Sequence, residues 1–180
     1  MLVERRFEQP VKFEDIQALE DAGSWCLKAY GVRFLKTFFS RDRQRMLCLY
    51  EAPDAEAVRL AETQANVPYE RAWTCAHLQS RKQVDETSVA EYVVAQRLFS
   101  EPVTRDFVSD ALRRSGWCLD LHRAEYVESY LGSDGLRMVC LFRAPDAEAV
   151  RLANEEGGIL YTDIWTASVH LADGDSPKGR

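Results

Sequence analysis

Apolar and polar residues alternate along several short segments of the chain, and these segments are rich in Val, Phe and Tyr, which predicts strands. Between them, residues 13–30 and 104–122 carry apolar side chains at helical spacing. The predicted strands are residues 2–7, 32–39, 45–51 and 69–78, followed by 92–99, 125–131, 137–143 and 160–171. In each set, one more helix follows the third strand.

The pattern occurs twice because the chain contains an internal repeat. The decapeptide APDAEAVRLA occupies residues 52–61 and again residues 144–153, and the same shift superposes WCL at 25–27 on WCL at 117–119. Each copy runs strand, helix, strand, strand, helix, strand, which is the ferredoxin-like pattern. The sequence therefore predicts an α+β protein made of two ferredoxin-like βαββαβ repeats.

The repeated decapeptide has the features of a structural helix. Asp54 and Asp146 stand where a side chain can cap the first turn, as does Thr104 at the start of another predicted helix. Cys26 and Cys118 follow a Trp on an apolar helix face, which favours packing in the core.

Splitting each strand by alternate positions separates two faces. Leu35, Phe39, Leu47 and Leu49, with their counterparts Val127, Leu131, Val139 and Leu141, are assigned to the helix side. The other face is then aromatic and sulfur-bearing, which is unusual for a surface in water. We therefore expect the two helix-free faces to pack together as a pseudo-dimeric α+β barrel with a shared lumen. The lumen set is Glu4, Phe34, Lys36, Cys48, Trp73, Tyr126, Glu128, Cys140 and Trp165.

Domain boundaries follow from the repeat and from polar segments. We expect a first repeat at residues 1–78, a linker at 79–89, a second repeat at 90–171 and a disordered tail at 172–180. Lys36 and Glu128 occupy equivalent inward positions with opposite charges, which favours pairing within one chain. The expected state is a monomeric pseudo-dimer or a weak homo-oligomer.

Composition excludes several classes of partner. The net charge is −6 and neither copy has a basic stripe, which disfavours nucleic acid. No apolar run is long enough for a membrane span, and Met1 leads directly into a strand without a signal peptide. Five cysteines in such a chain favour a reduced, cytoplasmic protein.

Residues 31–73 resemble a known family. The first-strand VER at 3–5, the strand around Phe34 and Thr37, and CLYEAP at 48–53 with its helix are similar to small ferredoxin-like domains described as nickel-binding or nickel-responsive. The second copy matches through residues 128–153. The resemblance implies inward Cys and His side chains as metal ligands: the Cys falls on Cys48 and Cys140, but the His falls on Lys36 and Glu128.

Two hypotheses of function from different classes follow. The first is a protein that binds a small molecule, or nickel or another divalent transition metal, with Cys48, Cys140, His77 and His170 as candidate metal ligands. The alternative is a barrel enzyme with little cofactor chemistry, for oxidation, cyclisation or isomerisation of a small apolar substrate. An interaction module without a ligand is a third. No motif identifies a catalytic residue.

Overall fold

The structure, a computed structural model, describes residues 1–79 and 91–172. The chain divides into two compact units, each an α+β structure. Unit 1 contains Met1–Thr74 together with the residues from Ser168 onward, and unit 2 contains Cys75–Ala167.

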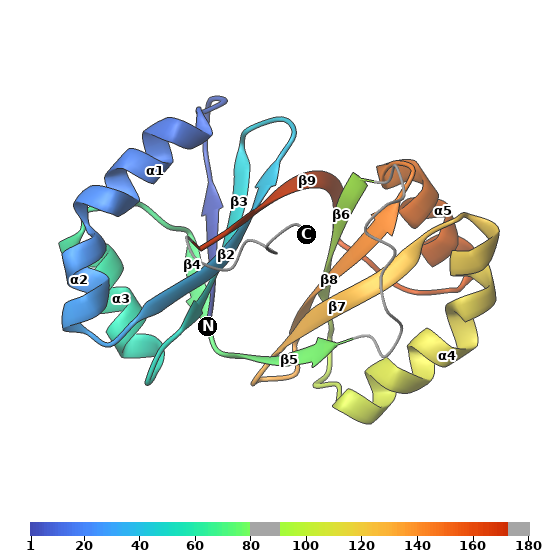
Figure 1. Cartoon of the computed structure of the whole chain (residues 1–180). Coiled ribbons are helices and arrows are strands. Elements are labelled where there is room, and N and C mark those ends of the chain that lie inside the picture. The colour runs from blue at the N-terminus through green and yellow to red at the C-terminus, as the bar shows by residue number, and fades with distance from the viewer. Residues whose placement is uncertain (80–90, 173–180) are drawn as a thin grey trace, which may run out of the picture. The chain divides into compact units, whose positions relative to one another are not determined.

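Unit 1 has an antiparallel sheet with its helices on one face (Figure 1). Its strands are β1 (Leu2–Arg6), β2 (Arg33–Ser40), β3 (Arg45–Glu51) and β4 (Arg71–Trp73), and its helices are α1 (Phe13–Ala22), α2 (Ser24–Ala29) and α3 (Ala55–Gln64). The pairings give the order β4-β1-β3-β2. Residues 168–172 lie beside β2, where the Ala172 amide donates to the Leu35 carbonyl at 3.0 Å.

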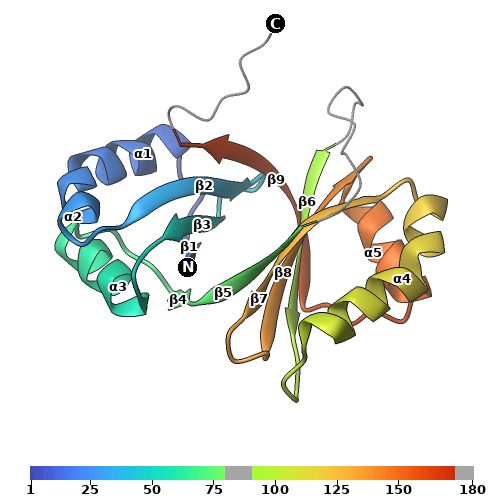
Figure 2. The same ribbon diagram turned by 60° about the horizontal axis from the view of Figure 1, so that its bottom comes forward.

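Unit 2 repeats this arrangement with one further strand. Its elements are β5 (Cys75–Gln79), β6 (Glu91–Leu98), α4 (Arg105–Leu121), β7 (Glu125–Gly132), β8 (Arg137–Ala144), α5 (Ala147–Glu156) and β9 (Asp163–Leu171). All pairings are antiparallel, and the order is β9-β6-β8-β7-β5. Helices α4 and α5 cover one face of the sheet (Figure 2).

The units differ from the continuous division expected from the sequence. The strand predicted over residues 69–78 is two strands: β4 pairs with β1 in unit 1, whereas β5 pairs with β7 in unit 2. Strand β9 likewise begins in unit 2 and ends with residues that belong to unit 1. The expected linker after Gln79 and nearly all of the expected tail lie outside the described residues.

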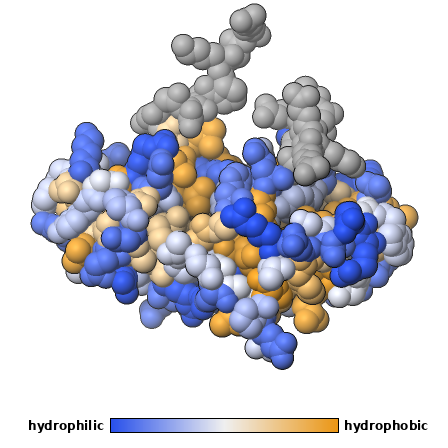
Figure 3. Space-filling model, turned by 90° about the horizontal axis from the view of Figure 1, so that it is seen from below, coloured by the Kyte–Doolittle hydropathy of each residue, from blue (hydrophilic) through white to orange (hydrophobic). Residues whose placement is uncertain are grey.

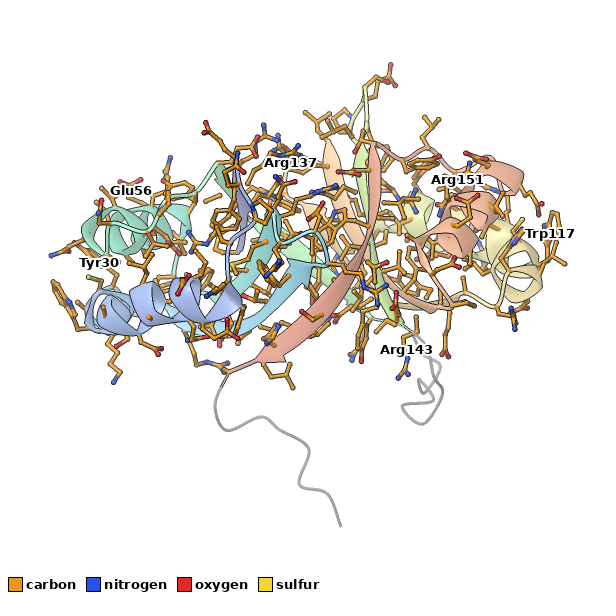
Figure 4. The ribbon with its side chains drawn as sticks, turned by 90° about the horizontal axis from the view of Figure 1, so that it is seen from above. Tyr30, Glu56, Trp117, Arg137, Arg143 and Arg151 are labelled. Carbon is orange, nitrogen blue, oxygen red and sulfur yellow. The ribbon has the colours of Figure 1, made fainter. Side chains whose placement is uncertain are left out.

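The expected helix caps are present in both units. The Asp54 carboxylate accepts from the Ala57 amide at 2.8 Å, and Asp146 does the same for Ala149. Thr104 caps α4. The second residue of each WCL run is fully buried as predicted, whereas the tryptophan before it is exposed, and Figure 4 shows Trp117 on the outside of α4.

In each unit, a glycine meets a slightly larger residue where two helices touch, and the glycine lies on opposite sides of this contact in the two units. A Cβ atom added to Gly23 would lie 2.5 Å from Ala65 Cβ, and Gly23 separates α1 from α2. The equivalent pair in unit 2 is Ser115 and Gly157, where the glycine stands on the other side of the contact. The serine lets α4 run unbroken over 17 residues.

The sheet faces differ from the predicted assignment, and the correction affects the candidate site. Cys48 pairs with Val3 and Thr37 and belongs to the core beneath the helices, so it does not face away from them. A β-bulge between Phe34 and Lys36 reverses the alternation along β2, and β7 has the same bulge. The wrongly assigned residues are Phe34, Met46, Cys48, Tyr50, Tyr126, Met138, Cys140 and Phe142, which lie on the helix side, and Leu47, Leu49, Val139 and Leu141, which do not.

The surface drawn in Figure 3 is largely hydrophilic, with apolar residues reaching it in places. None of the helices in the described ranges is long and apolar enough to cross a membrane.

Candidate functional site

The predicted lumen residues that do lie on helix-free faces hold polar contacts there. In unit 1, the Trp73 indole donates to Glu4 at 2.6 Å. In unit 2, the Trp165 indole donates to Gln96 at 3.3 Å. His77 lies 2.8 Å from the buried Glu128 carboxylate and stacks on Tyr130.

The four predicted metal ligands are not gathered within either unit. Cys48 and His170 belong to unit 1, where His170 stacks on Phe13, and Cys140 and His77 belong to unit 2. Across residues 1–79 and 91–172, no group of three or more His, Cys, Asp or Glu side chains is placed to hold a metal ion. Within the described part of the chain, the side chains are therefore not arranged as a nickel centre.

The most strongly charged buried cluster lies around Arg5 on the helix side of unit 1. Arg5 is 3% exposed, and its Nη2 lies 2.8 and 3.0 Å from the two oxygens of Glu62 and 3.3 Å from Glu20. The Tyr50 hydroxyl and the Cys48 thiol lie beside these groups. One buried cation is thus shared by two carboxyl groups.

Burial sets the protonation of this cluster. It raises the pKa of Glu20, although the Arg5 cation opposes the shift, and it raises the pKa of the Cys48 thiol to about 11. For Glu20, a folded-state pKa above the ordinary value means that the fold favours the protonated form. Its contribution to stability therefore falls as the pH rises above about 4.5 and through the folded-state pKa.

The equivalent arginine of unit 2 has different partners. Arg97 is 5% exposed and donates to the carbonyl of Leu160, to Asn154 Oδ1 at 2.7 Å and to Cys140 Sγ at 3.5 Å. Asn154 stands where unit 1 has Glu62, and Leu112 stands where it has Glu20. Among the described residues, every hydrogen-bond acceptor of Arg97 is therefore neutral.

A cavity of about 320 Å³ lies beside Arg97, beneath α4 and α5. Its walls are mostly apolar, and its polar side chains are Arg97, Arg114, Ser115 and Asn154. Ser115 donates to the backbone carbonyl of Ala111, and Asn154 to that of Val150. None of the described residues that line the cavity is acidic. The cavity thus combines an apolar interior with a buried cation.

Sequence reasoning missed both arginines. Arg5 and Arg97 are equivalent in the repeat, but a strand arginine is ordinarily exposed, and nothing in the alternation indicates its burial. The usable signal was the change from Glu62 to Asn154 within otherwise matched helices.

The burial of the cysteines predicts their reactivity. At pH 8, we expect Ellman's reagent to label only Cys75 rapidly, because it is partly exposed whereas the other four cysteines are buried. The raised pKa of Cys48 keeps it a thiol. Mass spectrometry of partly labelled protein identifies the sites, and all five should react in guanidinium. Rapid native labelling of Cys48 would contradict this arrangement.

The comparison with protein families shows to which family the chain belongs. The model of the nickel responsive protein SCO4226-like family matches residues 1–74 and again residues 92–166. The chain belongs to this family. It contains the family's domain twice, as the resemblance in the sequence implied. No curated protein matches the chain in sequence.

Three solved structures are similar over most of their length. A candidate chlorite dismutase is 15% identical, over 94% of this chain and 92% of its own, with a TM-score of 0.48. An anthrone oxidase-like protein is 11% identical over 99% and 96%, with a TM-score of 0.45. A candidate monooxygenase from Lactobacillus acidophilus NCFM is 8% identical over 93% and 92%, at 0.44. These scores are too low to assign a chemistry to this chain.

Proposed function

We propose that this member of the nickel responsive family binds a small amphipathic anion in the cavity of unit 2. The observation that carries the proposal is Arg97, a buried guanidinium beside an apolar cavity, with neutral acceptors only among the described residues. A buried charge is costly unless an opposite charge accompanies it. A ligand carboxylate supplies that charge.

The chemistry of a guanidinium defines the head of the ligand. Its planar array of N–H groups matches a carboxylate in a two-bond arrangement. Arg114, exposed on α4, lines the same cavity and adds a second positive charge. An anion is therefore attracted both at the buried end and at the exposed side.

The walls define the body of the ligand. Phe99, Phe107, Leu112 and Leu119 line the cavity, and its volume is at the small end of the range for small-molecule sites. Medium-chain aliphatic or bicyclic aromatic carboxylates have this size and polarity. Where the structure describes the lining, it contains no histidine, lysine or carboxylate to move protons, which favours binding over the alternative of a barrel enzyme.

The pseudo-dimeric barrel remains a proposal beside this one. We infer ferredoxin-like repeats from the order βαββαβ in each copy and from the matching strand orders. In that proposal, Glu4, Lys36, Trp73, Glu128 and Trp165 line the lumen. Phe34, Cys48, Tyr126 and Cys140 leave the lumen set because they lie beneath helices.

Calorimetric titration with octanoate and 2-naphthoate tests the anion site. Both should bind, and their neutral amides should bind about tenfold more weakly or worse, because only the acids carry the charge that Arg97 lacks. Arg97→Gln should remove the preference for the acid. Arg113→Gln, which changes an exposed arginine of α4 outside the cavity, should leave that preference unchanged. Equal binding of acid and amide to the unaltered protein would refute the proposal.

A further inference from the structure

Unit 1 contains a pocket of its own on the helix side, with the opposite charge. The pocket has a volume of about 460 Å³ and lies between α1, α2, the start of β2 and the residues that follow Ser168. Glu20 and Asp21 are its charged lining residues, and among the described residues neither a lysine nor an arginine lines it. It does not depend on the cavity of unit 2.

The carboxylate of Glu20 is the partly buried acidic group that lines this pocket. Arg5 lies behind it, but both oxygens of Glu62 contact Arg5 more closely than Glu20 does. Two carboxyl groups thus share one arginine, and Glu20, whose side chain is 14% exposed, is the one of the two that lines the pocket. Asp21 is held nearby by a 2.8 Å hydrogen bond from Gln17.

Aromatic rings form much of the remaining wall. Phe34 and Tyr50 meet edge to face with centroids 5.7 Å apart, and Phe13 stacks on His170 at 3.8 Å. Ring faces attract organic cations, and the attraction grows when the cation is shielded from water. Burial lowers the pKa of His170 from its ordinary value of 6.5, although Glu14 opposes this, so at pH 8 the ring is neutral and does not repel a cation.

We propose that this pocket binds an organic ammonium ion, whose charge lies against Glu20 and whose alkyl groups lie against the aromatic rings. A bare divalent metal ion fits less well, because the described residues contain no group of three metal-ligating side chains. The duplication has thus produced two helix-side pockets of opposite charge preference. Position 20 is Glu in the first copy, and the equivalent position 112 is Leu in the second.

Calorimetric titration with choline and with its uncharged isostere, 3,3-dimethylbutan-1-ol, tests the proposal at pH 8. Choline should bind, and the isostere should bind about tenfold more weakly or worse. Glu20→Gln should weaken choline binding to a similar extent. Asp15→Asn removes the same charge from an exposed position of α1 outside the pocket and should change nothing.

Two further readouts test the separate contributions of the carboxylate and the aromatic rings. Choline binding should weaken as the pH falls towards the raised pKa of Glu20, because protonation removes the charge of its carboxylate. Phe34→Leu should weaken choline binding while Glu20 keeps its charge. Equal affinity for choline and its isostere, or unchanged binding in Glu20→Gln, would overturn the proposal. Arg97→Gln alters only unit 2. The variant protein should therefore bind choline as tightly as the unaltered protein does, even if the proposal of an anion site proves wrong.

Discussion

Replacing Arg5 with methionine is expected to lower the free energy of unfolding by about 3–5 kcal/mol, because it leaves the carboxylate of Glu62 buried without a counter-charge. Methionine retains much of the apolar stem of arginine, so the loss reports mainly on charge. The bond from Arg5 to the carbonyl of Pro68, at 2.8 Å, is lost as well. Denaturation in urea, followed by circular dichroism, measures the change.

The repeat supplies a matched control for this prediction. Arg97→Met removes the equivalent arginine but leaves only neutral acceptors behind, so it should cost about 1–3 kcal/mol. Adding Glu62→Gln to Arg5→Met should recover part of the loss, because the orphaned charge is then gone. If both arginine variants lose the same stability, charge pairing is not what distinguishes the two units.

The second large effect is expected on binding. Asn154→Glu introduces into unit 2 the carboxylate that unit 1 has at Glu62, on an equivalent helix, and the new side chain should pair with Arg97. Octanoate affinity should then fall by about a hundredfold, because a carboxylate of the protein occupies the guanidinium and its charge repels the ligand. Stability should stay equal or rise, since the buried arginine gains a partner.

For the interpretation to hold, Asn154→Glu must lower the affinity for octanoate without lowering the stability of the protein. Calorimetry gives the affinity and thermal unfolding gives the stability. Ser100→Glu adds the same charge at an exposed position outside the cavity and should leave octanoate binding intact. Retained binding in a well-folded Asn154→Glu protein would show that Arg97 does not recognise the anion. A loss of both stability and binding would show instead that the equivalence of the two helices fails at this position.

Features that depend on neighbouring residues were predictable from the sequence. The α+β class and the caps at Asp54, Thr104 and Asp146 follow from local patterns, and the structure confirms them. Which strands β5 and β9 pair with was not predictable, because the choice of a strand's partner depends on distant residues. The two units therefore join segments that are distant in the sequence, which a division into continuous repeats does not describe.

The sheet faces could not be assigned because both are apolar. Leu47 and Cys48 are both buried, so hydrophobicity alone does not say which of them faces the helices. The bulge beside Lys36 adds a change of parity that the sequence does not mark. The candidate sites were missed for a related reason: they lie beneath the helices, in the core that sequence reasoning regards as filled by packing.

The division of β9 has a consequence for how the polypeptide reaches its native state during synthesis. Unit 2 is one uninterrupted stretch, so its last residue, Ala167, leaves the ribosome before the residues of unit 1 that follow it. Unit 1 draws on both ends of the chain and must wait for the residues after Ser168. We infer that unit 1, whose first residues are synthesised before those of unit 2, completes its fold after unit 2. A nascent chain arrested before that point would leave one side of β2 without its hydrogen-bonding neighbour.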